Sequence, residues 1–332
     1  MQVWMHRQGA GLFSNAHRVT EHAYFSRRGR RLEALWLYRR LLRKGQRVFI
    51  STATTTDMLL LNLAVRIAGR RTKSALDHVK LYIHWLYPAS GRMRRLKRMA
   101  RRYPGVAIAC PTTHVQHILQ ECGFTSVQVI PYPSSARRLL DSPRPQQFAK
   151  LLYAGAARLD KGFATIVQLV ELLQREHHSL PITIQCSPAH KGTHSDAVKL
   201  LIDRVTNSGY AYQNLTHETL DKAAYLQLFV GAIVLQPYEA KMFADRVSGV
   251  TLDALRLGCP VIAPANTWMA AVIQRFDAGA VIDPDARIQD WYTAIQSVLD
   301  HWERYATNAA IAGRILSAEH DPSHLMNWLR QS

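Results

Sequence analysis

The segment that most constrains the fold runs over residues 245–269 and has the sequence DRVSGVTLDALRLGCPVIAPANTWM. A polar turn at Ser248 and Gly249 precedes a predicted helix over residues 250–257, which ends at Gly258. A buried strand follows at residues 259–263, with a proline near its start. A helix, a glycine, a proline and an apolar strand in this order are typical of an α/β domain.

The turn at Ser248 and Gly249 also suggests a ligand. A small residue at the start of a helix leaves backbone N–H groups accessible, and the helix dipole favours an anion there. Asp253 lies one turn into the helix, and seven residues separate it from Asp245. An α/β domain with no ligand at this point would carry the same helix and strand, so both interpretations stay open.

Predicted strands and helices alternate along the whole chain, which indicates parallel, doubly wound sheets. The alternation starts at residue 2 and starts again at residue 150. Between them, residues 131–147 are rich in proline, serine and arginine and are typical of a linker. The chain of 332 residues is long enough for two domains. We predict boundaries at residues 1–147 and 148–316.

The excess of positive over negative charge lies entirely in the first half of the chain. Residues 1–150 hold 27 Lys and Arg against 6 Asp and Glu, a balance of +21, whereas residues 151–332 hold 15 against 18, a balance of −3. These sum to the formal net charge of +18. Such asymmetry favours an anionic partner, either a membrane surface or a nucleic acid, although solvated helix faces in a basic proteome would look the same.

Residues 91–102, GRMRRLKRMARR, concentrate this charge. Seven basic residues surround one apolar stripe made of Met93, Leu96, Met99 and Ala100. The pattern fits a helix on an anionic bilayer and fits a solvated helix packed on a sheet nearly as well. Aromatic residues do not interleave with the basic runs, which argues against nucleic acid as the partner.

Several features predict a cytoplasmic protein. The four cysteines have no paired spacing, which is typical of reduced thiols. Arg7 interrupts the only early apolar run, so no signal peptide is predicted. No apolar run reaches the roughly 18 residues of a membrane span. With the basic first half, we expect a protein on the inner face of the cytoplasmic membrane.

A second motif lies at residues 151–163, LLYAGAARLDKGF. It consists of a strand, a glycine turn, Arg158, and then Lys161 and Gly162 at the start of a helix. Two basic residues three apart in one turn can neutralise a group with about two negative charges, with the backbone amides of residues 248–250 as further donors.

These motifs resemble those of the family-4 glycosyltransferases, which are retaining enzymes of the GT-B fold. That family carries two Glu separated by seven residues where this chain has Asp245 and Asp253. A subgroup with the pattern R-x-S-G-V, followed by T-W-M after the strand, is closer, and here its residues are Arg246, Ser248, Gly249, Val250, Thr267, Trp268 and Met269. Residues 107–133 are similar to the end of the family's first domain.

The resemblance implies a donor site for a nucleotide sugar. Arg158, Lys161 and the amides of Ser248, Gly249 and Val250 would bind the diphosphate with no metal ion. Asp253 would accept hydrogen bonds from the ribose hydroxyls. Asp245 would contact the donor sugar; Glu239, six residues earlier, is its rival because Asp is one methylene shorter than Glu.

Further candidates lie in the first half. His84 follows a predicted strand where family members carry a histidine on the acceptor side, so the predicted catalytic set is His84, Asp245, Arg158 and Lys161. Gly9 and Gly11, in the loop after the first strand, are weaker candidates for donor contacts. The resemblance also implies that residues 317–332 form a helix that crosses back to the first domain, and that the two domains face each other across a cleft.

The predicted function is therefore retaining transfer of a sugar from a nucleotide sugar to a hydroxyl of a lipid-linked or cell-envelope saccharide in a bacterium. An NDP-sugar epimerase of the same fold is an alternative, although the first half offers few carboxylates for acid and base roles. A basic nucleic-acid-binding protein and an inactive glycosyltransferase, given the two Asp replacements, are the others.

Overall fold

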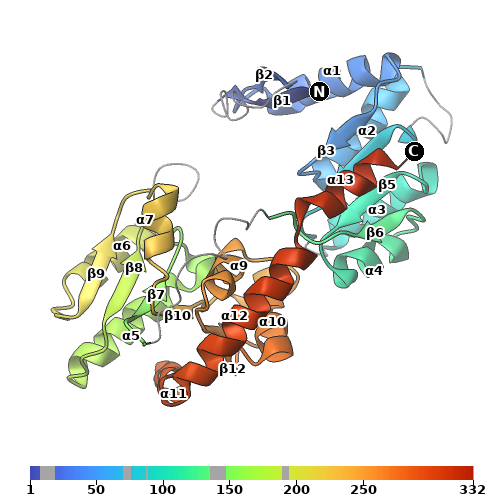
Figure 1. Ribbon diagram of the computed structural model, residues 1–332. Coiled ribbons are helices and arrows are strands. Elements are labelled where there is room, and N and C mark those ends of the chain that lie inside the picture. The colour runs from blue at the N-terminus through green and yellow to red at the C-terminus, as the bar shows by residue number, and fades with distance from the viewer. Residues whose placement is uncertain (8–18, 70–75, 87–88, 135–146, 189–193, 332) are drawn as a thin grey trace. The chain divides into compact units, whose positions relative to one another are not determined.

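The computed structural model describes residues 1–7, 19–69, 76–86, 89–134, 147–188 and 194–331. It divides into two compact units, which are labelled by element in Figure 1. Unit 1 comprises Met1–Pro131 and Asn327–Ser332, and unit 2 comprises Tyr132–Met326.

Unit 1 is built on a parallel sheet whose described strands run in the order β3-β4-β5-β6 (Val48–Ile50, Val79–Tyr82, Ala107–Cys110 and Val127–Val129). Its helices are α1 (Arg30–Arg43), α2 (Thr55–Ile67), α3 (Ser90–Arg102) and α4 (Thr113–Glu121). The predicted first strand, β1 (Gln2–His6), pairs in parallel with β2 (Thr20–Phe25), and within the described residues these two form a sheet of their own. Strand β2 was not predicted from the sequence.

The apolar stripe of α3 lies inside unit 1. Leu96, Met99 and Ala100 are buried in the core formed by the sheet and its helices, and Met93 packs against it. Of the two interpretations of this helix, the structure supports the one in which the stripe covers the sheet. The stripe is therefore not available for insertion into a bilayer, and the basic residues of α3 occupy its outer faces.

Unit 2 has the doubly wound topology predicted from the alternation. Its described strands are all parallel in the order β12-β11-β10-β7-β8-β9, which reverses direction between β7 and β10. They are β7 (Lys150–Tyr153), β8 (Ile182–Gln185), β9 (Gln213–Thr216), β10 (Ala232–Leu235), β11 (Val261–Pro264) and β12 (Gly279–Ile282). Open sheets of this type bind ligands where the strand order reverses, beyond the carboxyl ends of the strands.

Helices cover both faces of this sheet and form two apolar cores with it. They are α5 (Phe163–Arg175), α6 (Asp196–Thr206), α7 (Lys222–Gln227), α8 (Ala240–Phe243), α9 (Gly249–Arg256), α10 (Trp268–Phe276), α11 (Ile288–Asp300) and α12 (Trp302–Glu319), with a 3-10 turn at Leu159–Lys161. The predicted helix at residues 250–257 and strand at 259–263 correspond to α9 and β11. Strand β9 and the short helix α8 were not predicted from the sequence.

The end of the chain returns to unit 1. Helix α13 (Pro322–Arg330) follows α12, and unit 1 includes the chain from Asn327 onward. There Trp328 is buried against Phe49, and Nζ of Lys80 donates to the carbonyl oxygens of Trp328 and Gln331, at 2.6 Å each. Across the described residues, no helix is both long and apolar enough to cross a membrane.

Candidate functional site

The predicted donor residues of unit 2 lie on the loops that follow β7 and β10, the two strands between which the sheet order reverses. The loop after β7 carries Gly155, Arg158 and Lys161. The loop after β10 leads through Tyr238 and α8 to the start of α9 at Ser248. The topology therefore brings together two motifs that are about ninety residues apart in the sequence.

Three basic side chains form what we call the cationic cluster: Arg158, Lys161 and Arg246. Burial, together with the nearby charges of Arg158 and Arg246, lowers the pKa of Lys161 to about 8, against the opposing effect of Asp160. Arg158 is tied to Asp160 by an ion pair, in which Nε donates to Oδ1 at 2.8 Å. Burial and Arg158 also lower the pKa of Arg246, whose guanidinium lies 5.0 Å from the Phe243 ring centre. The mutual repulsion within this cluster favours binding of an anion.

Gly155 shows how closely the two loops meet. Its φ of +101° lies in the region that favours glycine. A Cβ placed there would lie 3.1 Å from Nζ of Lys161 and 3.9 Å from Cγ2 of Val250. The ammonium of Lys161, which also lies 5.2 Å from the Tyr238 ring centre, and the Val250 side chain in the first turn of α9 therefore both border Gly155.

The start of α9 is fixed by buried polar contacts. The Ser248 hydroxyl caps the helix by accepting from the Thr251 N–H, at 3.3 Å, and from Nε2 of Gln236, at 3.2 Å. The Thr251 hydroxyl donates to Oε1 of Gln236 at 2.6 Å. A Cβ added at Gly249 would meet no atom within 4 Å, so the fold itself does not require glycine at this exposed position. A preorganised helix start with open space in front of it suits an anionic group.

A different glycine locks the two loops together. Gly162 has a φ of +66°, and a Cβ there would overlap the carbonyl oxygen of Pro237 in the loop after β10. In addition, the backbone N–H of Glu239 donates to the carbonyl oxygen of Asp160 at 3.0 Å. These contacts hold the turn that carries Arg158 and Lys161 against the loop that leads to α9.

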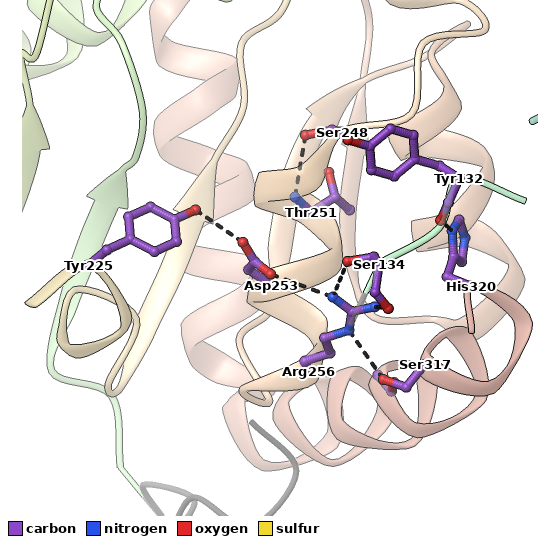
Figure 2. A network of polar contacts seen from close by, with 10 residues as sticks. Tyr132, Ser134, Tyr225, Ser248, Thr251, Asp253, Arg256, Ser317 and His320 are labelled. Atoms are coloured by element: carbon purple, nitrogen blue, oxygen red, sulfur yellow. Dashed lines mark hydrogen bonds and ion pairs between the residues drawn. The ribbon is translucent and has the colours of Figure 1, made fainter. Parts of the chain in front are cut away.

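The second part of the site is the Asp253 network, which comprises Asp253, Tyr225, Arg256, Ser134 and Ser317 (Figure 2). Tyr225 Oη donates to Oδ2 of Asp253 at 3.3 Å, and Nη1 of Arg256 lies 3.6 Å from Oδ1. The Asp253 side chain retains 25% exposure. Burial raises the pKa of this carboxyl, while Arg256, the Tyr225 hydrogen bond and Lys222 oppose the rise. A partly exposed carboxylate held in one orientation can accept hydroxyl hydrogen bonds from a ligand.

The two rivals for contact with a donor sugar lie on the same loop. Asp245 is partly buried, three residues before Ser248. Glu239 is exposed and stands at the start of α8. The choice of Asp245 over Glu239 stays a prediction.

The predicted residues of the first half belong to unit 1 or lie outside the described residues. His84 follows β4, and its Nε2 donates to the carbonyl oxygen of Ser51 at 2.7 Å. Burial lowers the pKa of His84, so the neutral imidazole is favoured. Gly9 and Gly11 fall within residues 8–18, outside the described residues. Among the described residues, no group of three or more His, Cys, Asp or Glu side chains is arranged to hold a metal ion.

The structure adds site residues that the prediction did not include. Arg246 was recognised only as part of the R-x-S-G-V pattern, although its position two residues before Ser248 was a usable signal. Arg256 also had a local signal, because it follows Asp253 by three positions on one predicted helix. Gln236 and Tyr225 had none, because each acts through a contact between segments that are separate in the sequence.

Comparison with solved structures gives the same fold. HepE of Anabaena in complex with UDP matches with a TM-score of 0.70 at 15% identity, covering 96% of this chain and 86% of that chain. A glycosyltransferase from Rickettsia africae matches with a TM-score of 0.68 at 12% identity, covering 100% and 90%. Sucrose-phosphate synthase from Thermosynechococcus elongatus matches with a TM-score of 0.64 at 13% identity, covering 92% and 79%.

At these identities the likeness concerns the fold. No protein-family model matches the sequence, and no curated protein matches it. The solved structures are glycosyltransferases of the GT-B type, and one of them was determined with UDP-glucose bound. This chain therefore has the α/β fold of the GT-B glycosyltransferases.

Proposed function

We propose that this protein is a metal-independent glycosyltransferase that binds a nucleotide sugar in unit 2 and transfers the sugar with retention of configuration. The observation that carries the proposal is the position of the cationic cluster beside the start of α9, at the strand reversal between β7 and β10. A diphosphate is the ligand whose charge matches this arrangement. The fold shared with HepE, which was solved with UDP, supports the same ligand class.

In the proposed reaction, an acceptor hydroxyl oxygen bonds to the anomeric carbon as the bond to the diphosphate oxygen breaks. The departing diphosphate takes up negative charge and helps accept the hydroxyl proton. Arg158 and Lys161, with the N–H groups at the start of α9, would stabilise this charge as it grows. Asp253 would hold the ribose, Asp245 would contact the donor sugar, and His84 would serve the acceptor side.

The donor site is tested by thermal-shift measurements without added metal, using UDP, GDP, ADP, dTDP and their sugars. A nucleotide at about a hundredfold its dissociation constant stabilises a protein by roughly 2.7 kcal/mol. We expect one nucleotide to raise the melting temperature, and Arg158→Ala combined with Lys161→Ala to abolish the increase. No shift with any nucleotide in a folded sample would reject the donor site and favour an inactive protein or a nucleic-acid-binding one.

The fate of the nucleotide sugar in the absence of an acceptor separates transfer from epimerisation. An epimerase on this fold converts the nucleotide sugar with no acceptor present and needs carboxylates for proton transfer. Incubation of the bound nucleotide sugar alone, followed by chromatography of the sugar, is expected to return the same sugar or its slow hydrolysis product. A second nucleotide sugar would overturn the transferase proposal in favour of the epimerase.

The acceptor proposed is a lipid-linked or cell-envelope saccharide, with unit 1 held at an anionic membrane surface on the cytoplasmic side. The charge of +21 in residues 1–150 supports this partner. Helix α1 adds an apolar contact: Leu32 and Trp36, one turn apart, are 67% and 53% exposed, and the Arg39 guanidinium lies 5.2 Å from the Trp36 ring centre. Exposed tryptophan and leucine among arginines favour a lipid interface over a nucleic acid.

Co-sedimentation with vesicles of acidic or neutral lipids tests this partner, with duplex DNA as a competitor. We expect binding to acidic vesicles only, weakened in Leu32→Ser combined with Trp36→Ser, two exposed positions whose change spares the core. If the protein binds duplex DNA and does not bind acidic vesicles, the membrane proposal is rejected.

A further inference from the structure

Arg256 is the most deeply buried charged side chain of the Asp253 network, with 1% exposure. Its guanidinium makes contacts in three directions (Figure 2). Nη1 faces Oδ1 of Asp253 at 3.6 Å and donates to the Ser134 hydroxyl at 2.8 Å. Nε donates to the Ser317 hydroxyl at 3.1 Å, and Nη2 reaches the Ser134 carbonyl oxygen at 3.5 Å. One planar, permanently charged group thus fixes Asp253 and two other segments.

The two segments held by Arg256 are those by which the chain passes between the units. Unit 2 begins at Tyr132, two residues before Ser134, and the chain returns to unit 1 at Asn327, ten residues after Ser317. The segments also bind each other. Nδ1 of His320 lies 2.7 Å from the Tyr132 carbonyl oxygen, and the Ser134 N–H donates to the His320 carbonyl oxygen at 2.9 Å.

The backbone around Arg256 leaves little freedom for these contacts to shift. Gly313 in α12 lies so close to α9 that a Cβ there would overlap the Leu255 carbonyl oxygen. The Ser317 hydroxyl also donates a hydrogen bond to the Gly313 carbonyl oxygen, at 2.6 Å. Asp253 and Arg256, three residues apart, are therefore neighbours on one side of α9, and the close packing against α12 holds this helix in place.

We propose that Arg256 is a positioning residue for the nucleotide: it orients the Asp253 carboxylate toward the ribose hydroxyls and ties that carboxylate to both segments through which the chain passes between its units. This inference rests on the proposed nucleotide-sugar site. It assigns Arg256, Ser134 and Ser317 a role in nucleoside affinity, although none of them touches the nucleotide.

The charge environment of Asp253 gives this role a distinct signature. The charged and titratable groups facing the carboxyl are Arg256 on its own helix and Tyr225 and Lys222 on α7, and His320 faces Arg256 from the end of α12. Arg256 and Lys222 favour the ionised carboxylate. Loss of the Arg256 charge raises the pKa of Asp253, so nucleoside binding that needs the carboxylate is lost at a higher pH as the solution is acidified.

The experiment measures the affinity of the full chain for UDP, GDP and ADP, and for inorganic pyrophosphate as a probe that lacks ribose, between pH 5 and pH 8. We expect Arg256→Gln to weaken the preferred nucleotide about ten- to a hundredfold and to move the acidic loss of binding to higher pH. Arg256→Lys keeps the charge, so it is expected to weaken the nucleotide while leaving the acidic loss near its original pH. Asp253→Asn identifies the contribution of Asp253, because nucleotide binding by this variant is expected no longer to decrease as the solution is acidified through the Asp253 titration.

Two milder variants keep the proposal testable if Arg256→Gln does not fold. Ser134→Ala and Ser317→Ala each remove one partner of the guanidinium and leave every charge in place. Each is expected to weaken the nucleotide about three- to tenfold with pyrophosphate affinity unchanged. Ser323→Ala, a change on the same C-terminal part of the chain outside the network, serves as the matched control.

The outcomes separate this inference from the proposed function. If the parent protein binds neither pyrophosphate nor any of the nucleotides, the donor site itself is wrong. If the parent binds a nucleotide, but the serine variants and the folded Arg256 variants retain its affinity and its pH profile, Arg256 has only a structural role and this inference is wrong.

Discussion

The cationic cluster lies near the start of α9 and the Asp253 network is built on that helix, yet the two are built in opposite ways. Arg158, Lys161 and Arg246 come from two loops, and their charges raise each other's energy. Asp253, by contrast, is held by oppositely charged and hydrogen-bonding partners from α7 and α9. The first arrangement keeps an excess of positive charge beyond its ion pair with Asp160, so a bound anion would stabilise it. In the second arrangement the carboxylate already has partners within the chain, and a ligand hydroxyl would donate a further hydrogen bond to it.

The difference predicts that the backbone under the cationic cluster tolerates little change. In Gly162→Ala the new Cβ would meet the Pro237 carbonyl oxygen at a φ of +66°. We expect a loss of at least about 2 kcal/mol in the free energy of unfolding, measured by chemical denaturation.

Gly249→Ala is the matched control for this change, since open space surrounds that position. It is expected to keep the stability of the parent but to weaken nucleotide binding, because the methyl group occupies the space in front of the helix. Equal stability of the two variants would contradict the interlocked loops.

The Asp253 network is expected to contribute to nucleoside binding and not to phosphate binding. Asp253→Asn keeps the shape of the side chain but removes its charge, so it is expected to weaken the preferred nucleotide about ten- to a hundredfold. Calorimetric titration with the nucleotide and with inorganic pyrophosphate checks this. A matching loss of pyrophosphate affinity would show that the two parts of the site are not separable.

The cationic cluster, in turn, is expected to titrate. With a pKa of about 8, Lys161 loses its charge as the pH rises, so nucleotide affinity is expected to fall about tenfold from pH 7 to pH 9. In the unliganded protein a rise in pH has the opposite effect: it increases the free energy of unfolding. Since the pKa of Lys161 in the folded protein lies below the usual lysine value of 10.5, the contribution of Lys161 to the free energy of unfolding rises between pH 8 and pH 10.5.

Lys161→Arg separates this effect from other titrations, because the guanidinium stays charged throughout the range. The variant is expected to bind the nucleotide with a nearly constant affinity from pH 7 to pH 9. A decline as steep as that of the parent would assign the pH dependence to another group.

The same contrast explains what the sequence could predict. The cationic cluster was largely found, because Arg158 and Lys161 lie three apart in one motif and because strand, glycine and helix follow local rules. The alternation of strands and helices likewise predicted the doubly wound sheet of unit 2. Sequence periodicity also found the apolar stripe of α3, but it could not tell whether a sheet or a bilayer covers it.

Most contacts of the Asp253 network could not be predicted, because contacts between distant segments leave no local pattern; the Asp253–Arg256 pair, three residues apart on α9, does follow a local spacing. Ser134 and Ser317 are separated from Arg256 by 122 and 61 positions, and each is an ordinary serine in its own surroundings. The strand β2 was missed for a related reason: within the described part of the chain it pairs with β1 alone, and its burial is incomplete, so it lacks a clear apolar alternation.

The Tyr225 hydroxyl is expected to make the smallest of these contributions to nucleotide affinity. Tyr225→Phe removes one hydroxyl, which donates to Oδ2 of Asp253 at 3.3 Å, and leaves the ring in place against Phe229. Because the bond is long and Arg256 still holds the carboxylate, we expect only about a two- to fivefold loss of nucleotide affinity. Since the hydrogen bond also opposes the raised pKa of Asp253, the acidic loss of binding should move slightly upward in pH. A loss as large as that of Asp253→Asn would mean that Tyr225, and not Arg256, positions the carboxylate.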